Sequence, residues 1–258
     1  MKLKIKYIFL TVIFFTTMYL NSQDDNTAGI IKYYHDHVVC LGVIDVNKIQ
    51  DIETVEHLFF YNSSILNFQD IIRAENLESL TIIGSTFESI ESIAGLKYLK
   101  KIHISFCSIF DISFFATMNF LEELDLGNNM ITCIEALSSL ENLKILLLWN
   151  NDINDISSLQ NLSNLFYLNL SNNKINDISP LRSLENLNTL ILSINNINDI
   201  SSLQNLNNLF HLNLSKNNII DISPLRDLEK LSYLDLSLNN ISDLSFLGDL
   251  DKQFILFY

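Results

Sequence analysis

Large apolar residues return along this chain in a fixed 22-residue frame. If the leucine that opens each copy is repeat position 0, apolar residues also occupy positions 3, 5, 10, 13, 16 and 19, and six copies have Asn at position 8. The opening leucines are Leu77, Leu99, Leu121, Leu143, Leu165, Leu187, Leu209 and Leu231. Internal repetition with a period of about 20–29 residues is typical of a solenoid, in which each copy stacks on its neighbours.

The spacing within one copy predicts a short strand followed by an irregular return. Positions 3 and 5 alternate as the buried residues of a strand do. Positions 10, 13, 16 and 19 lie three residues apart, which suits a 3₁₀ helix or an irregular segment on the opposite side. In two copies Ser179 and Ser223 stand where a helix N-cap is expected. Pro180 and Pro224 follow at the first helical position, where a missing N–H costs nothing.

The motif LxxLxLxxNxIxDIxxLxxL stands almost unbroken over residues 143–250. It is similar to the leucine-rich repeat family in its 22-residue bacterial form, and within that family it most resembles the internalin-type repeat. The resemblance covers roughly residues 55–258. It implies an α/β solenoid, a curved right-handed coil with a parallel β-sheet on the concave face and short 3₁₀ or irregular segments on the convex face.

The resemblance also implies that the asparagines at position 8 stack as a ladder. A buried turn needs partners for its backbone polar groups, and a side-chain amide supplies donors and an acceptor at one place. The ladder residues are Asn129, Asn151, Asn173, Asn195, Asn217 and Asn239. Ser85 and Cys107 hold this position in the first two copies, so we expect a weaker ladder there.

The ends of the chain differ from the repeats. Residues 1–22 place three lysines before an apolar run, which is typical of a cleaved export signal; an uncleaved membrane anchor is the alternative. Residues 23–32 form a polar lead-in, 33–76 an N-terminal cap and a degenerate repeat, 77–252 the eight repeats, and 253–258 the strand of a partial terminal repeat. We expect a secreted, periplasmic or cell-surface protein with no membrane span in its mature chain.

The formal net charge of the whole chain is −14. Export signal removal would take away Lys2, Lys4 and Lys6, leaving 13 basic against 30 acidic residues, or −17. This balance argues against nucleic acid or an anionic membrane as a partner. Repeat position 12 holds acids at Asp111, Asp155, Asp177, Asp199, Asp221 and Asp243. We interpret them as solvated turn acids, with calcium binding as the alternative.

Side chains alternate along a strand, so positions 2, 4 and 6 should point out of the concave sheet. The fold does not dictate these residues, and they are free to carry function. Trp149, the only tryptophan, should be exposed among them, and clustered exposed aromatics favour a protein interface. The alternative is a surface that only keeps the protein soluble. The predicted partner-binding residues are Ile145, Leu147, Trp149, Tyr167, Asn169, Ile191, His211, Asn213, Tyr233 and Asp235.

The sequence gives little indication of an enzyme active site or a cofactor-binding site. No nucleophile elbow, phosphate loop, zinc helix or paired-carboxylate motif is present, so we expect no enzyme activity, no catalytic residues and no cofactor. If the cap keeps the repeat frame, His35 and His37 take outward positions 2 and 4, and His57 takes position 2 of the next strand. Three imidazoles could then bind a metal; unrelated surface histidines are the alternative.

These observations predict a secreted or surface-exposed repeat protein that binds an unidentified protein through its concave face. Adhesion or host interaction, as in internalins, is one version of this function. The alternative is a structural or scaffold module that associates through its uncapped C-terminal edge at residues 253–258.

Overall fold

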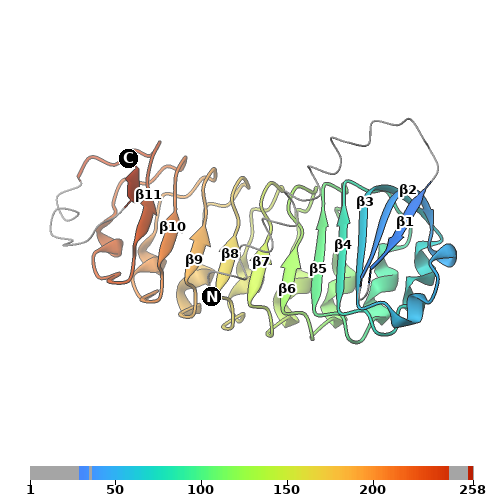
Figure 1. The fold of residues 1–258 in the computed structure, drawn as a ribbon. Helices are drawn as coiled ribbons and strands as arrows, with labels where there is room; N and C mark the ends of the chain where they lie inside the picture. The colour runs from blue at the N-terminus through green and yellow to red at the C-terminus, as the bar shows by residue number, and fades with distance from the viewer. Residues whose placement is uncertain (1–28, 35–36, 244–254, 258) are drawn as a thin grey trace.

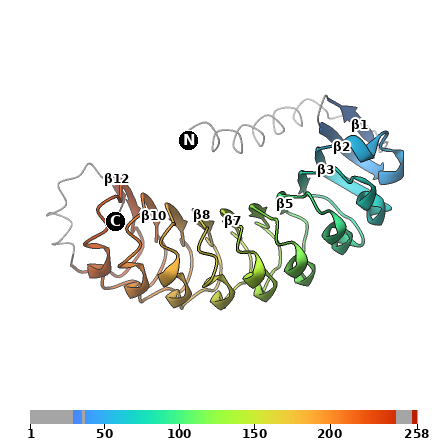
Figure 2. The same ribbon diagram turned by 90° about the horizontal axis from the view of Figure 1, so that it is seen from below.

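The structure, a computed structural model, describes residues 29–34, 37–243 and 255–257. Each turn of the chain contributes one strand to a continuous sheet (Figure 1). Figure 2 shows the strands along the inner, concave side of an arc and the short helices along its outer, convex side. The fold is the solenoid that the repeat spacing predicts.

Twelve strands form the sheet within the described residues, in the order in which they occur in the chain. They are β1 (Ile30–Tyr33), β2 (His37–Asp45), β3 (His57–Leu66), β4 (Ser79–Ile83), β5 (Lys101–Ser105), β6 (Glu123–Asp125), β7 (Ile145–Leu147), β8 (Tyr167–Asn169), β9 (Thr189–Ile191), β10 (His211–Asn213), β11 (Tyr233–Asp235) and β12 (Ile255–Phe257). β1 runs antiparallel to β2, and all later neighbours are parallel.

Short 3₁₀ helices return the chain across the convex side. They are η1 (Val46–Lys48), η2 (Ile52–Thr54), η3 (Phe68–Arg73), η4 (Ile90–Gly95), η5 (Ser113–Thr117), η6 (Glu135–Ser139), η7 (Ser157–Leu159), η8 (Ser179–Ser183), η9 (Ser201–Leu203) and η10 (Ser223–Leu225). The apolar residues at repeat positions 0, 3, 5, 10, 13, 16 and 19 face inward between the sheet and these helices. In the copy that opens at Leu165, all seven are at most 1% exposed.

The helix starts are capped by the acids at position 12, not by the serines that the sequence suggested. Ser179 is the first residue of η8, and its N–H donates to Oδ1 of Asp177 at 2.8 Å. The same bond joins Ser113 to Asp111 and Ser157 to Asp155. Bonds from the serine N–H and hydroxyl hold the pKa of Asp111 and Asp155 below the usual value of a carboxyl group. These acids therefore serve the turn, which accounts for their repetition.

The position-8 asparagines form a continuous ladder. Asn173 is a typical member: its Oδ1 accepts the N–H of Ile153, two residues past the ladder residue of the preceding copy, at 3.0 Å. Its Nδ2 donates to the carbonyl oxygens of Leu148 and Leu170, at 2.9 and 3.1 Å. One amide thus ties two copies together and satisfies three buried backbone groups. Ser85 has a shorter side chain and bonds the N–H of Ser63 and its own copy's Ile83 carbonyl.

A second row of amides, absent from the sequence prediction, lies at position 21, just before each copy opens. Asn164 Nδ2 donates to the carbonyl oxygen of Glu141 at 2.8 Å, reaching the end of the preceding copy. Equivalent bonds are made by Asn76, Asn142, Asn186 and Asn208. Not every copy has this amide: the exposed Tyr98 and Phe120 take its place in two consecutive copies, and Lys230 takes it in the copy that opens at Leu209.

The N-terminal cap departs from the expected frame. The regular repeat spacing would pair His37 with Phe59, but His37 pairs with His57, two positions earlier in the chain. A bulge between Leu41 and Gly42 then changes the register, so that Gly42 pairs with Ser63, only one position short of the regular 22-residue spacing. Gly42 has a positive φ of 80°, a conformation that suits glycine. The assignment of His37 to repeat position 4 was therefore wrong, because the return through η1 and η2 is shorter than in the regular copies.

Candidate protein-binding surface

The ten outward residues expected on the concave face all lie there, on or next to β7–β11. Each is partly exposed and alternates with the buried residues of its strand, as in β8, where Leu168 is buried between Tyr167 and Asn169. They are Ile145, Leu147, Trp149, Tyr167, Asn169, Ile191, His211, Asn213, Tyr233 and Asp235. This alternation leaves the ten side chains available on one face without disturbing the core.

Trp149 is half-buried rather than freely exposed. Its indole lies against the backbone of Gly127 in the preceding copy, where an added Cβ would overlap the indole ring. The ring also meets Phe106 edge-on, with ring centroids 5.7 Å apart and an interplanar angle of 68°. Gly127 therefore makes the space that sets the orientation of Trp149, a relationship that the repeat frame alone did not predict.

A charged group precedes this aromatic pair on β5 and β6. Glu123 is buried, with Oε1 3.2 Å from Nε2 of His103 and Oε2 3.5 Å from Nζ of Lys101. Burial alone would raise the pKa of Glu123, but His103 and Lys101 hold it below its usual value. These residues lie outside the surface predicted from the sequence, although they belong to outward positions of the two preceding copies.

Asp125 lies beside this group and next to the apolar part of the surface. Its Oδ1 accepts the N–H of Gly127 at 2.9 Å, and its Cα partner on β7 is Leu147. Burial raises the pKa of Asp125, and Glu123 adds to the rise, while His103 and the Gly127 N–H oppose it. Burial raises the pKa of Tyr167, and the charge of Asp125 adds to the rise.

The C-terminal part of the face is more polar, and its polar groups are bonded to one another. Asn169 Oδ1 accepts both the N–H and the hydroxyl of Ser171, at 3.0 and 2.7 Å. Asn213 bonds Ser215, and Asp235 bonds Ser237, in the same way. His211 stacks on Tyr233 with centroids 4.0 Å apart, and burial lowers its pKa, partly offset by Asp235. Ser171, Ser215 and Ser237, all at repeat position 6, thus have a local structural role.

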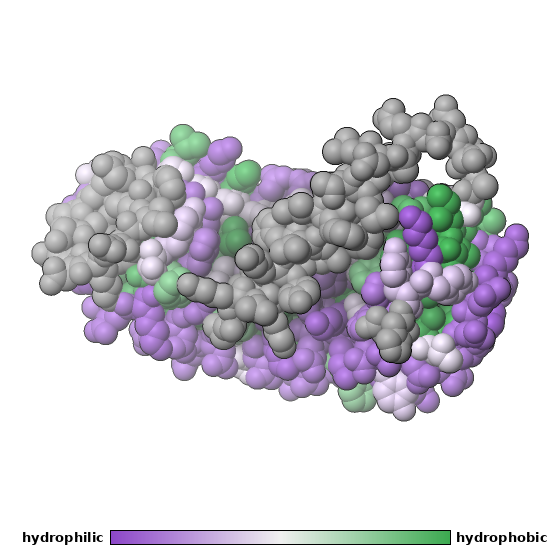
Figure 3. Space-filling view, viewed as in Figure 1, coloured by the Kyte–Doolittle hydropathy of each residue, from purple (hydrophilic) through white to green (hydrophobic). Residues whose placement is uncertain are grey.

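The N-terminal end of the sheet carries a further group of aromatic and apolar side chains. His37 stacks on Tyr34 at 4.8 Å and meets Phe59 edge-on at 5.9 Å. Figure 3 shows apolar residues gathered at this end, over β1–β3. His35 lies outside the described residues, and the described part of the chain holds no group of three possible metal ligands. The three-histidine metal site remains a hypothesis.

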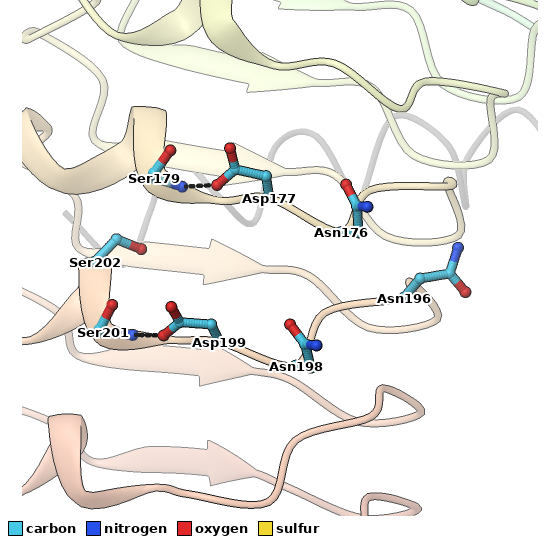
Figure 4. Close-up of a pocket in the computed structure, with 8 residues that line it drawn as sticks. All are labelled: Asn176, Asp177, Ser179, Asn196, Asn198, Asp199, Ser201 and Ser202. Atoms are coloured by element: carbon cyan, nitrogen blue, oxygen red, sulfur yellow. Dashed lines mark hydrogen bonds between the residues drawn. The ribbon is translucent and has the colours of Figure 1, made fainter.

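A polar pocket lies away from the concave face, between the returns of two adjacent copies (Figure 4). It is lined by Asn176, Asp177, Ser179, Asn196, Asn198, Asp199, Ser201 and Ser202. Asp177 and Asp199 each accept the N–H of the serine two residues later, at 2.8 Å. Because both carboxylates already cap 3₁₀ helices, this pocket is explained by turn formation, and the concave face is the better candidate for function.

Comparisons with known proteins agree with this geometry. Residues 141–183 match the family described as Leucine Rich repeats (2 copies). The crystal structure of an internalin, inlF, from Listeria monocytogenes is 26% identical, with a TM-score of 0.74; the match covers 84% of this chain and 72% of that one. Internalin C2 from the same species is 31% identical, with a TM-score of 0.68, covering 74% of this chain and 83% of that one.

More distant matches bear on the fold alone. The leucine-rich repeat ectodomain of the Arabidopsis thaliana receptor kinase GASSHO1/SCHENGEN3, solved in complex with CASPARIAN STRIP INTEGRITY FACTOR 2, is 20% identical with a TM-score of 0.63. The match covers 84% of this chain and 34% of that one. No curated protein matches the chain. Among the described residues, no helix has the length and apolar character needed to cross a membrane.

Proposed function

Because the chain belongs to the leucine-rich repeat family, in its internalin-like form, we propose that it is an exported protein whose concave face binds another protein. The export part of the proposal rests on the lysines and apolar run of residues 1–22, which lie outside the described residues, and on the resemblance to internalins. The binding part rests on the composition of the concave surface.

The observation that carries the proposal is the apolar cluster at the centre of that surface. Ile145, Leu147, Trp149 and Tyr167 share one face at positions where other copies also carry polar residues such as Asn, Ser or Thr, so the solenoid does not require apolar side chains there. Large side chains exposed without a structural need favour an interaction site. Trp and Tyr are also the residues most often found at the energetic centres of protein interfaces.

The setting of Trp149 strengthens this argument. Contact with Gly127 and Phe106 fixes the indole before any partner arrives, so little side-chain entropy should be lost on binding. The cluster therefore has the two properties of an interface centre, namely apolar area and a defined orientation.

The test is an unbiased pull-down with the purified chain, followed by affinity measurements on the partner it recovers. Trp149→Ala should weaken that binding at least about tenfold, because truncation at an interface centre commonly costs about 2 kcal/mol or more. Gln160→Ala, an exposed change on the convex side, should leave binding unchanged. Both variants should keep a cooperative thermal transition.

The outcomes separate the candidate surfaces. If Trp149→Ala binds the recovered partner as the parent does, the interface lies elsewhere. The aromatic group of His37, His57 and Phe59 at the N-terminal end is then the next surface to test. Unfolding of the Trp149→Ala variant would instead show that the indole belongs to the core.

A further inference from the structure

Asp125 and Glu123, two charged groups of the concave face, differ in how their negative charge is balanced. The nearby Glu123 is paired with both Lys101 and His103. No lysine or arginine in the described part of the chain forms an ion pair with Asp125, and Nε2 of the nearby His103 lies 3.2 Å from Oε1 of Glu123. A partly buried carboxylate without a cation carries a desolvation cost that a partner's charge could relieve.

The fold does not need this negative charge. In four copies the side chain at repeat position 4 accepts the N–H of the residue two places later, as Asp125 does from Gly127. Asn169 and Asn213 make the same bond in their copies, at 3.0 Å each, with a neutral amide. An asparagine would therefore satisfy the backbone at Asp125 equally well, and the carboxylate needs another explanation.

The surroundings of Asp125 suit a cationic side chain. Leu147 lies across from it on β7, and Tyr167, on the following strand β8, pairs with Ile145, two residues before Leu147. The Trp149 indole packs on Gly127, only two residues beyond Asp125. A carboxylate on the same face as two aromatic side chains offers charge attraction and cation–π contact to the same ligand group, and apolar neighbours suit the methylene stem of lysine or arginine.

We infer that the Asp125 carboxylate, with Trp149 and Tyr167 beside it, is the subsite that receives a lysine or arginine side chain of the protein partner. This inference rests on the proposed function, and it specifies the chemistry of the partner. It agrees with the charge of the whole chain, −14, which would draw a basic partner toward the solenoid at low salt.

A library of random linear peptides displayed on phage tests the inference with the purified chain. Peptides selected on the parent should share a lysine or arginine at a fixed place in their motif. A synthetic selected peptide should bind Asp125→Asn at least about tenfold more weakly than the parent. Replacing its basic residue by norleucine should weaken binding to a similar degree, and the two changes together should cost little more than either alone.

Asp155→Asn is the matched control. Asp155 lies on the return, outside the concave surface, and accepts the N–H of Ser157 at 2.8 Å, so the change removes an equal charge from a turn held by the same kind of bond. It should alter binding of the selected peptide by less than about twofold. Unchanged melting temperatures for both variants would show that the asparagine preserves the turn.

The possible results distinguish the inference from the function on which it rests. If Trp149→Ala weakens peptide binding but Asp125→Asn does not, the concave face binds proteins and the basic subsite is wrong. If neither change matters, both proposals fail. Enrichment of peptides without a basic residue, or failure to enrich any peptide, also overturns the inference.

Discussion

The first and the later copies of the repeat satisfy the same backbone groups by different means. In the later copies the N–H of repeat position 10 is bonded by a ladder amide, as Ile153 is by Asn173. Near the start of the array the backbone of the next copy does this: the Ile65 N–H donates to the Thr86 carbonyl at 2.8 Å, beside an isolated bridge between Ser64 and Thr86. The strands differ accordingly, since β3 has 10 residues and β7–β11 have three each.

This difference shows that the asparagine at position 8 is a local solution rather than a requirement of the solenoid. Where strand pairing continues past position 8, the small Ser63 or Ser85 suffices, because backbone groups bond one another directly. Where pairing stops after three residues, one amide must satisfy several groups at once. The cost of losing a position-8 side chain should therefore depend on the copy.

The largest effect is expected from Asn173→Ala in the later copies. The change leaves the Ile153 N–H and the carbonyl oxygens of Leu148 and Leu170 without their partner in a buried turn. We expect a loss of about 1–3 kcal/mol in the free energy of unfolding, measured by denaturant titration. Ser85→Ala should cost less, because neighbouring backbone groups are already paired in the first copies.

The outward Asn188 provides the control for this prediction. It makes one side-chain bond, to the Asn208 carbonyl at 3.3 Å, and it is only partly buried. Asn188→Ala should cost under about 0.5 kcal/mol. Equal denaturation midpoints for the Asn173 and Asn188 variants would contradict the ladder argument.

A smaller effect is expected at the boundary between the two regions, where Phe106 from an early copy and Trp149 from a later one meet over Gly127. Gly127→Ala would force the indole away, because an added Cβ overlaps the ring. We expect a loss of about 1–2 kcal/mol in stability and a red shift of the fluorescence of Trp149, the only tryptophan.

Gly95→Ala is the matched control, since its added Cβ would meet only Cγ2 of Ile72 at an ordinary 3.6 Å. It should leave the fluorescence of Trp149 unchanged. An unshifted emission spectrum for Gly127→Ala would mean that the indole does not rest on Gly127.

The regular part of this molecule could be predicted from the sequence because one period fixes burial, strand and return at once. Leu168 and Leu170 are buried and Tyr167 and Asn169 face outward for the same reason, the alternation of a strand. The cap escaped prediction because its register is shorter than the regular spacing and changes again at the bulge beside Gly42. Periodicity carries no information about such local insertions.

The candidate site was predictable only in part. The repeat frame places Trp149 on the concave face, but its orientation depends on Gly127 in the preceding copy, and thus on contact between copies. Glu123 and Asp125 occupy outward positions that the frame identifies, yet their different pairing with His103 and Lys101 is visible only in three dimensions. The spacing of residues along the chain does not predict which side chains of neighbouring strands contact one another.

The smallest predicted effect would transfer a feature of the later copies to the early ones. Phe120 is exposed at repeat position 21, where Asn142 in the next copy donates to the Asn119 carbonyl at 2.8 Å. In Phe120→Asn the new amide should reach the equivalent carbonyl, that of Lys97, and extend the second amide row by one copy. One added hydrogen bond between copies should raise the free energy of unfolding by about 0.5–1 kcal/mol.

Phe120→Ala separates this gain from the effect of removing an exposed ring, since it takes away the aromatic side chain without supplying an amide. Comparison of the two variants by thermal melting isolates the contribution of the bond. A measurably higher melting temperature for Phe120→Asn than for Phe120→Ala would show that the amides at position 21 stabilise the solenoid as a second ladder. Equal melting temperatures would mean that the asparagines there follow from repetition of the sequence and add little to stability. In either case Phe120 occupies a place that the four following copies give to asparagine, so the solenoid does not impose an aromatic ring there.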